Sequence, residues 1–255
     1  MSKLSVIISA YDNQEMTVEH VKKCMESSYI PYEIIVVNDG GDDKLRQMLK
    51  DIPEKKCQII YALVSEDIPW NQCGARNLGF FISRGDFISV EDNDHFPDNT
   101  YYEEAVELLK TYDRVKPKRR HVVEMKDVLQ GNFEPKTARG ATDLTCILTR
   151  ELFVKLKGYE EKFCGHYGWE APDWIHRIDR VGGKSICNGY MYVVIDGGVN
   201  LIPRRHDGKN FLMDKENYWE LRRNNKALRK QSTKGILNFN YTIECLNSNP
   251  LSQTQ

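Results

Sequence analysis

The sequence lacks several features that would assign it to a specialised class of protein. Its 36 lysines and arginines nearly balance 37 acidic residues, which argues against nucleic acid or an anionic membrane as the main partner. No run approaches the roughly 20 apolar residues that a bilayer-spanning helix needs, so membrane contact would be peripheral. No basic segment with a long apolar run stands at its start, and we expect no secretory signal. Its 255 residues suffice for one large α/β domain or two small ones.

Cysteine pairs of the C-x-x-C type are also absent, and there is no internal repeat or flexible linker. The seven cysteines are scattered along the chain and odd in number. This pattern favours reduced, mostly buried thiols in a cytoplasmic protein.

Strand-like and helix-like patterns alternate as far as Asp94. The β-rich runs lie at 4–9, 33–37, 58–63 and 87–90, and helical spacing appears at 14–27, 43–51 and 73–83. This alternation predicts an α/β fold with a mostly parallel sheet and right-handed crossovers. Such sheets bind ligands beyond the carboxyl ends of their strands. Two of the runs end in polar clusters, Asn38–Asp39 and Asp92–Asp94, and we expect these clusters to share one crevice.

The pattern changes after Asp94. Helices are predicted at 100–109, 150–156, 172–180 and 219–231, a strand and turn at 122–132, and a late strand at 190–195. The basic segment 114–120 is predicted to be a loop. We interpret this half as a small mixed extension of the first.

Asp92 and Asp94 form a D-x-D pair at a predicted strand end. Two such carboxylates can hold a hard divalent cation and leave positions open for phosphate oxygens; the alternative is a solvated acidic turn. Asp39 could accept from a base or ribose hydroxyl while Gly40 lets the backbone approach the ligand, or the two could close an Asx turn. Arg76, at a helix start, could face a pyrophosphate, tie the acidic strand ends together, or lie on the surface.

Two later segments carry further candidates. Aromatic rings such as Tyr167 and Trp169 pack on sugar rings, and Glu170 and Asp173 at a helix start suit a general base. His206, in a basic segment after the late strand, could be a third metal ligand or part of a surface loop.

In this order the motifs resemble glycosyltransferase family 2 of the GT-A fold. The motifs are S-V-I-I-S-A-Y from Ser5, I-I-V-V-N-D-G from Ile34, A-R-N-x-G from Ala75, D-N-D from Asp92 and G-W-E from Gly168. The segment after Arg205 is similar to the end of the β-1,4-galactosyltransferase domain. The resemblance implies a single domain over 1–245, with a nucleotide-sugar-binding half at 1–98, an acceptor-binding half at 99–245 and a polar tail at 246–255.

Residue roles follow from the same resemblance. Ala10, Tyr11 and Asp39 would contact the base of a nucleoside-diphosphate sugar, most simply a UDP-sugar. Asp92 would reach ribose or metal. Asp94 would bind the metal, Mn²⁺ or Mg²⁺, with the diphosphate, and His206 would complete the metal shell.

The family's late motif is Glu-Asp-x-Asp, and here it is Glu170-Ala171-Pro172-Asp173. We predict an inverting transfer to a hydroxyl of a glycan or lipid-linked acceptor, with Asp173 narrowly favoured over Glu170 as the base. The alternatives are a retaining transferase, since retaining relatives lack a base at the position of Ala171, and an inactive nucleotide-sugar-binding module. A nucleotidyltransferase would need a glycine-rich basic loop after the first strand, and Tyr11–Gln14 is not one.

Overall fold

A computed structural model of the chain describes residues 2–40, 43–68, 70–140, 142–143, 145–164, 170–195, 237 and 239–247. The predicted helix at 219–231 and most of the polar tail lie outside this part of the chain. Among these described residues, no helix combines the length and apolar character needed to cross a bilayer.

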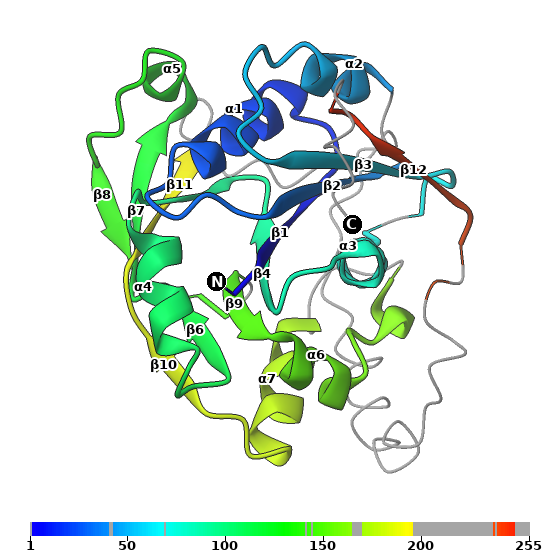
Figure 1. Cartoon of the computed structure of the whole chain (residues 1–255), viewed down its shortest axis with the longest axis vertical. Coiled ribbons are helices and arrows are strands. Elements are labelled where there is room, and N and C mark those ends of the chain that lie inside the picture. Colours follow the sequence, from blue (N-terminus) through cyan, green and yellow to red (C-terminus); the bar gives the residue numbers. More distant parts are fainter. Residues whose placement is uncertain are drawn as a thin grey trace, which may run out of the picture.

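The main sheet has eight strands and forms the centre of the molecule (Figure 1). Its strands, in order across the sheet, are β10 (Ser185–Cys187), β6 (Arg114–Lys116), β9 (Cys146–Thr149), β4 (Phe87–Asp92), β1 (Leu4–Ala10), β2 (Glu33–Asp39), β3 (Gln58–Val64) and β12 (Tyr241–Cys245). Strands β4, β1, β2 and β3 run parallel, whereas β9 and β12 pair with their neighbours antiparallel. The predicted parallel sheet is therefore confirmed as the core of a mixed one.

Helices cover both faces of this sheet, which explains why its central strands are apolar along their whole length. On one face lie α1 (Gln14–Met25), α2 (Lys44–Lys50) and α4 (Tyr101–Leu108). On the other lie α3 (Gln72–Ile82), α6 (Arg150–Leu156) and α7 (Glu170–Arg180). Figure 1 shows α1 and α2 on the side of the β1–β3 layer opposite to α3, α6 and α7. Every residue of β2 is buried between these layers.

A second sheet of four strands stands beside the first. Its order is β5 (His95–Pro97), β11 (Tyr190–Ile195), β7 (Arg119–Glu124) and β8 (Thr137–Arg139). A short helix, α5 (Met125–Val128), follows β7, and a 3-10 turn, η1 (Glu161–Phe163), precedes α7. The predicted strand and turn at 122–132 is thus the end of β7 followed by a helix.

The loop predicted over 114–120 is wrong, because this basic segment supplies β6 and the start of β7. Its charges are accommodated by specific partners. Arg114 and Lys116 both donate to one carboxylate oxygen of Asp143, at 2.7 and 2.8 Å. A basic segment can therefore form a strand where a nearby acidic side chain neutralises its charges.

Candidate functional site

The carboxyl ends of three neighbouring strands meet at one edge of the main sheet. Strand β1 lies between β4 and β2, with Ser9 in register with Asp92 and Ala10 in register with Asn38. Asp39 ends β2 and Asp92 ends β4. The two acidic clusters therefore flank the end of β1 at one edge of the sheet, next to each other as the strand pattern predicts.

Asp39 is buried and held by a side chain from another element. Its Oδ1 accepts from Asn71 Nδ2 at 2.9 Å, and Asn71 directly precedes α3. The next residue, Gly40, has φ of +79°, and a Cβ there would lie 2.8 Å from Asp67 Cα. Glycine is needed at this position for the turn and for close contact with the chain's own backbone.

Tyr11 follows β1 at the same edge of the sheet and is partly exposed. Asp12 and Asn13 then adopt left-handed backbone conformations, with φ of 55° and 51°, before α1 begins. Ala10, which is buried, and Tyr11 therefore lie at the same strand ends as Asp39, and their contact with a nucleoside base stays a prediction.

Asp92 is bound by two donors from α3. Its Oδ1 accepts from Arg76 Nη2 at 2.6 Å and from Gln72 Nε2 at 2.7 Å. Arg76 has no exposed surface, so the surface alternative is wrong. Burial alone lowers the pKa of Arg76, but the neighbouring Asp92 carboxylate raises it above its ordinary value, and the guanidinium stays charged. Arg76 therefore ties the end of β4 to α3.

The rest of the A-R-N-x-G motif has structural roles. Asn77 donates to the Tyr159 carbonyl at 2.9 Å and accepts from the Tyr159 amide at 2.8 Å. A Cβ on Gly79 would lie 2.3 Å from Ile7 Cγ2, so only glycine lets α3 approach β1 this closely. The Arg76 guanidinium also lies 5.1 Å from the centre of the Tyr159 ring.

Asp92, Asp94 and His95 form a cluster whose ligand-type atoms all lie within 4.8 Å of one another. His95 Nδ1 is 2.7 Å from Asp94 Oδ1 and 3.9 Å from Asp92 Oδ2. Sequence reasoning missed His95, although it directly follows Asp94. Its side chain is brought to the carboxylates because β5 turns back from β4 to pair with β11.

The cluster fits a hard divalent cation. Burial opposes the ionisation of Asp94, but the adjacent His95 holds its pKa below the ordinary value, so the carboxylate is charged at neutral pH. Oδ1 of Asp92 accepts hydrogen bonds from Arg76 and Gln72, whereas Oδ2 lies on the side of His95. Carboxylate oxygens are suitable ligands for Mg²⁺ or Mn²⁺, whereas the neighbouring Asp94 raises the pKa of His95 against the effect of its burial, so His95 serves better as a partner of Asp94 than as a ligand. His206, the predicted third ligand, lies outside the described residues.

The two acids of α7 differ in their surroundings. Asp173 Oδ2 accepts from Arg177 Nε at 2.8 Å, and Arg177 also donates to the carbonyls of Leu156 and Gly158 at 2.9 and 2.6 Å. Asp173 is therefore part of the attachment between α7 and α6. Glu170 is buried, and burial raises its pKa. The charges of Arg76 and Asp92 act on that pKa as well, in opposite directions.

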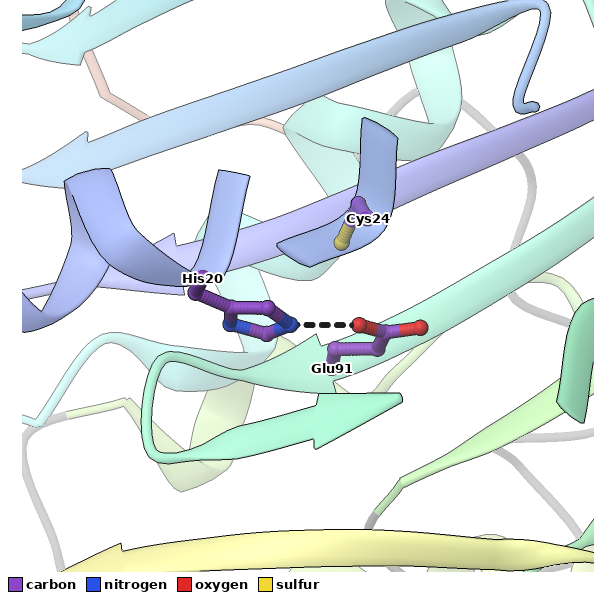
Figure 2. Close-up of side chains that lie close together, drawn as sticks. All are labelled: His20, Cys24 and Glu91. Atoms are coloured by element: carbon purple, nitrogen blue, oxygen red, sulfur yellow. Dashed lines mark hydrogen bonds and ion pairs between the residues drawn. The ribbon is translucent and has the colours of Figure 1, made fainter. Parts of the chain in front are cut away.

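A buried polar cluster lies between α1 and the end of β4, where Figure 2 shows His20, Cys24 and Glu91 close together. His20 Nε2 lies 2.7 Å from Glu91 Oε2, while Tyr102 donates to Glu91 Oε1 at 2.9 Å and lies 3.1 Å from the sulfur of Cys24. Burial raises the pKa of Cys24, which keeps it a thiol. Glu91 precedes Asp92, so α1 and α4 anchor the strand end that carries the site.

The fold and this site define a class of α/β proteins that bind a ligand beyond the ends of parallel strands. A model of the family described as Glycosyl transferase family 2 matches residues 5–153, which is more than half of the chain. The chain belongs to this family, which confirms the predicted family.

Curated relatives share the family over part of their length. A chondroitin synthase of Pasteurella multocida is 27% identical over 236 residues, which cover 77% of this chain and 24% of that protein. An uncharacterised glycosyltransferase of Haemophilus influenzae is 27% identical over 111 residues, 43% of each chain. The chain spans less than half the length of these relatives.

Solved structures confirm the GT-A type of α/β fold. TarS of S. aureus superposes with a TM-score of 0.64 at 15% identity, over 92% of this chain and 70% of that one. A mannosyltransferase of Pyrobaculum calidifontis gives 0.54 at 16% identity, over 91% and 65%. The predicted galactosyltransferase-like segment after Arg205 and the predicted acceptor platform, Tyr167 and Trp169, lie outside the described residues.

Proposed function

We propose that the protein transfers a sugar from a nucleoside-diphosphate sugar to a hydroxyl group of an acceptor, with the help of a divalent cation. The observation that carries this proposal is the meeting of Asp39, Asp92 and Asp94 around the end of β1. Support comes from two structural neighbours, one solved with UDP-GlcNAc and one with GDP-Man and Mn²⁺. A UDP-sugar is the first donor to test, and the acceptor is a glycan or a lipid-linked sugar.

Different residues at the strand ends would bind the base, the ribose and the cation of the donor complex. Ala10, Tyr11 and Asp39 receive the base. Asp92, held by Arg76, receives the ribose or the cation. Asp94 holds the cation, which when bound neutralises the charge that develops on the leaving diphosphate. His206 remains the proposed additional ligand.

Glu170 is the better candidate for the general base in an inverting transfer. It would take the proton of the acceptor hydroxyl while that oxygen bonds to the anomeric carbon and the bond to the diphosphate breaks. Its burial raises its pKa, which makes the carboxylate a stronger proton acceptor. Asp173 is committed to Arg177. We therefore propose Glu170 as the base and a positioning role for Asp173, in place of the narrow preference for Asp173.

The decisive experiment measures cleavage of a panel of nucleotide sugars, beginning with UDP-GlcNAc, with Mn²⁺ and with excess chelator. Asp94→Asn should lose cleavage. Asp86→Asn is the matched control, because Asp86 lies just before β4, at the opposite end of that strand, where it accepts from the Lys3 amide at 2.8 Å. Equal cleavage by both variants, or full activity in chelator, would refute the metal-dependent reading. Retention of the anomeric configuration in the product would replace the inverting mechanism by a retaining one.

A further inference from the structure

Three consecutive residues at the start of α3 have unusual features next to the two acidic strand ends. Trp70 has a φ of 45°, a left-handed conformation that bulky residues rarely adopt. Asn71 Oδ1 and Gln72 Oε1 are buried and have no hydrogen-bond partner within the described part of the chain. A buried polar atom left in this way costs stability. Backbone strain and unpaired polar atoms confined to one short segment indicate that this segment serves a site as well as the fold.

The two amides donate to the acids of the proposed donor site. Asn71 Nδ2 donates to Asp39 Oδ1 at 2.9 Å, and Gln72 Nε2 donates to Asp92 Oδ1 at 2.7 Å. An amide turned the other way would place its oxygen against a carboxylate oxygen, so the acids fix the orientation of both amides. The unpaired carbonyl oxygens are a consequence of this orientation.

Asn71 is the N-cap residue of α3, but in the described structure its side chain makes no capping hydrogen bond. An asparagine at this position usually accepts from a backbone N–H of the first turn. The side chain of Asn71 donates to Asp39 instead. It therefore supports the end of β2 rather than the first turn of its own helix.

These adjacent residues reach two strand ends that are not adjacent. Strand β1 separates β2 from β4, which places the strands that end in Asp39 and Asp92 about 10 Å apart. Successive Cα atoms of a chain are only about 3.8 Å apart. The side chains of Asn71 and Gln72 must therefore diverge across the end of β1, one towards each acid. Together the two amides fix the position of one acid relative to the other.

We propose that Asn71 and Gln72 are positioning residues of the donor site, with separate effects on base selectivity and on nucleotide affinity. Asn71 acts through Asp39, the acid proposed to receive the base, and therefore governs which base is accepted. Gln72 acts with Arg76 on Asp92, and therefore governs affinity for the part that all nucleoside diphosphates share. A site discriminates between bases only when its hydrogen-bonding groups have fixed directions. This inference rests on the proposed function and deepens it.

Nucleotide binding tests the two roles without turnover. The full chain is titrated with UDP, CDP and GDP in the presence of Mg²⁺, and each Kd is measured by calorimetry. Asn71→Ser should narrow the ratio between the weakest and the tightest Kd about tenfold, because Asp39 loses its fixed direction. Gln72→Ala should raise all of these Kd values by about three- to tenfold and leave their ratio unchanged, because Arg76 still holds Asp92.

Matched controls remove the same kind of hydrogen bond elsewhere. Gln47 donates to Asp51 at 2.8 Å, and Asn188 donates to Glu104 at 2.7 Å. Gln47→Ala and Asn188→Ala should change neither a Kd nor the ratio. The melting temperature of every variant is measured as well, since a merely structural role would lower it without changing the ratio.

Two further variants keep the test decisive if a truncated side chain prevents folding. Asn71→Gln and Gln72→Asn retain the amide and change its reach by one methylene group, so each should reproduce the effect of the shorter variant at its position. An equal loss of affinity for every nucleotide in the Asn71 variants overturns the proposal. Unchanged Kd values in the variants of both residues, or a wild type that binds the nucleotides equally, overturn it as well. A wild type that binds no nucleotide would refute the proposed function itself, and this inference with it.

Discussion

Glu170→Gln and Asp173→Asn each remove one negative charge from α7 and keep the shape of the side chain. The two carboxylates lie on one helix and are both buried, but only Asp173 has an arginine on its carboxylate in the described structure, at 2.8 Å. The pair therefore separates loss of a base from loss of a structural contact.

The two variants are expected to change different quantities: Asp173→Asn the melting temperature, and Glu170→Gln the rate of transfer. Asp173→Asn weakens a charge-assisted hydrogen bond that is worth about 1.5–3 kcal/mol, so the melting temperature should fall by about 3–12 °C in a chain of this size. Turnover at a temperature where the variant is folded should change little. Glu170→Gln removes a general base, and the rate of transfer should fall by about 10²- to 10⁴-fold. Its melting temperature should stay level, because a carboxylate with a raised pKa gains little from ionising in the folded protein.

The pH dependence of the rate and of the stability tests the role of Glu170 independently. Because burial raises the pKa of Glu170, the acid limb of kcat/KM should lie above the ordinary range for a glutamate. The folded state holds this proton more tightly than the unfolded state. Stability from this group therefore declines as the pH rises from the unfolded pKa to the folded one, and Glu170→Gln should abolish that decline. The assays are scanning calorimetry and initial rates across pH.

A clear result would refute this reasoning. If Glu170→Gln keeps turnover within about threefold while Asp173→Asn loses it by 10²-fold or more at an unchanged melting temperature, Asp173 is the base. If neither variant slows transfer, the base lies elsewhere or the reaction retains configuration.

Three further outcomes are expected. Asp94→Ala should abolish Mn²⁺-dependent donor binding, measured by calorimetry, with little change in melting temperature, and binding that survives in excess chelator would contradict it. Gly79→Ala places a methyl group against Ile7 and should destabilise the protein by about 1–3 kcal/mol in urea unfolding, whereas an unchanged midpoint would show that α3 can shift. Glu91→Leu leaves the buried His20 without its carboxylate partner and should lower the free energy of unfolding by about 3–5 kcal/mol. The double variant His20→Leu with Glu91→Leu should recover part of that loss. A double variant as unstable as the single one would argue against the pair.

The four parallel strands could be predicted because both of their faces are buried. A continuous apolar run at this length leaves few alternatives, and each predicted run agrees with its strand to within two residues. The predictions end too early at β2 and β4, where polar residues such as Asp39 and Asp92 still pair in the sheet. Those residues break the apolar pattern because they belong to the site.

The short strands could not be predicted, since their pairing depends on distant segments. Strands β5, β6, β8 and β10 have three residues each and β9 has four, too few for a periodic signal. His95 was missed for this reason, because its approach to Asp94 depends on β5 pairing with β11. The role of Asp173 had a signal in the sequence, since Arg177 follows it by four residues on a predicted helix.

The buried Arg76 joins β4 to α7 through a series of contacts. Its guanidinium holds Asp92 at 2.6 Å and lies over the ring of Tyr159, and that ring stacks on Trp174 of α7 at 4.0 Å between centroids. Glu170 begins the same helix. The carboxylate proposed for the donor and the carboxylate proposed for the acceptor hydroxyl are therefore positioned by one continuous buried stack. Because a buried stack of this kind has little freedom to rearrange, the separation between the two acids is set by packing. Arg76 therefore has a structural role that links the end of β4 to α7, whatever ligand it also contacts.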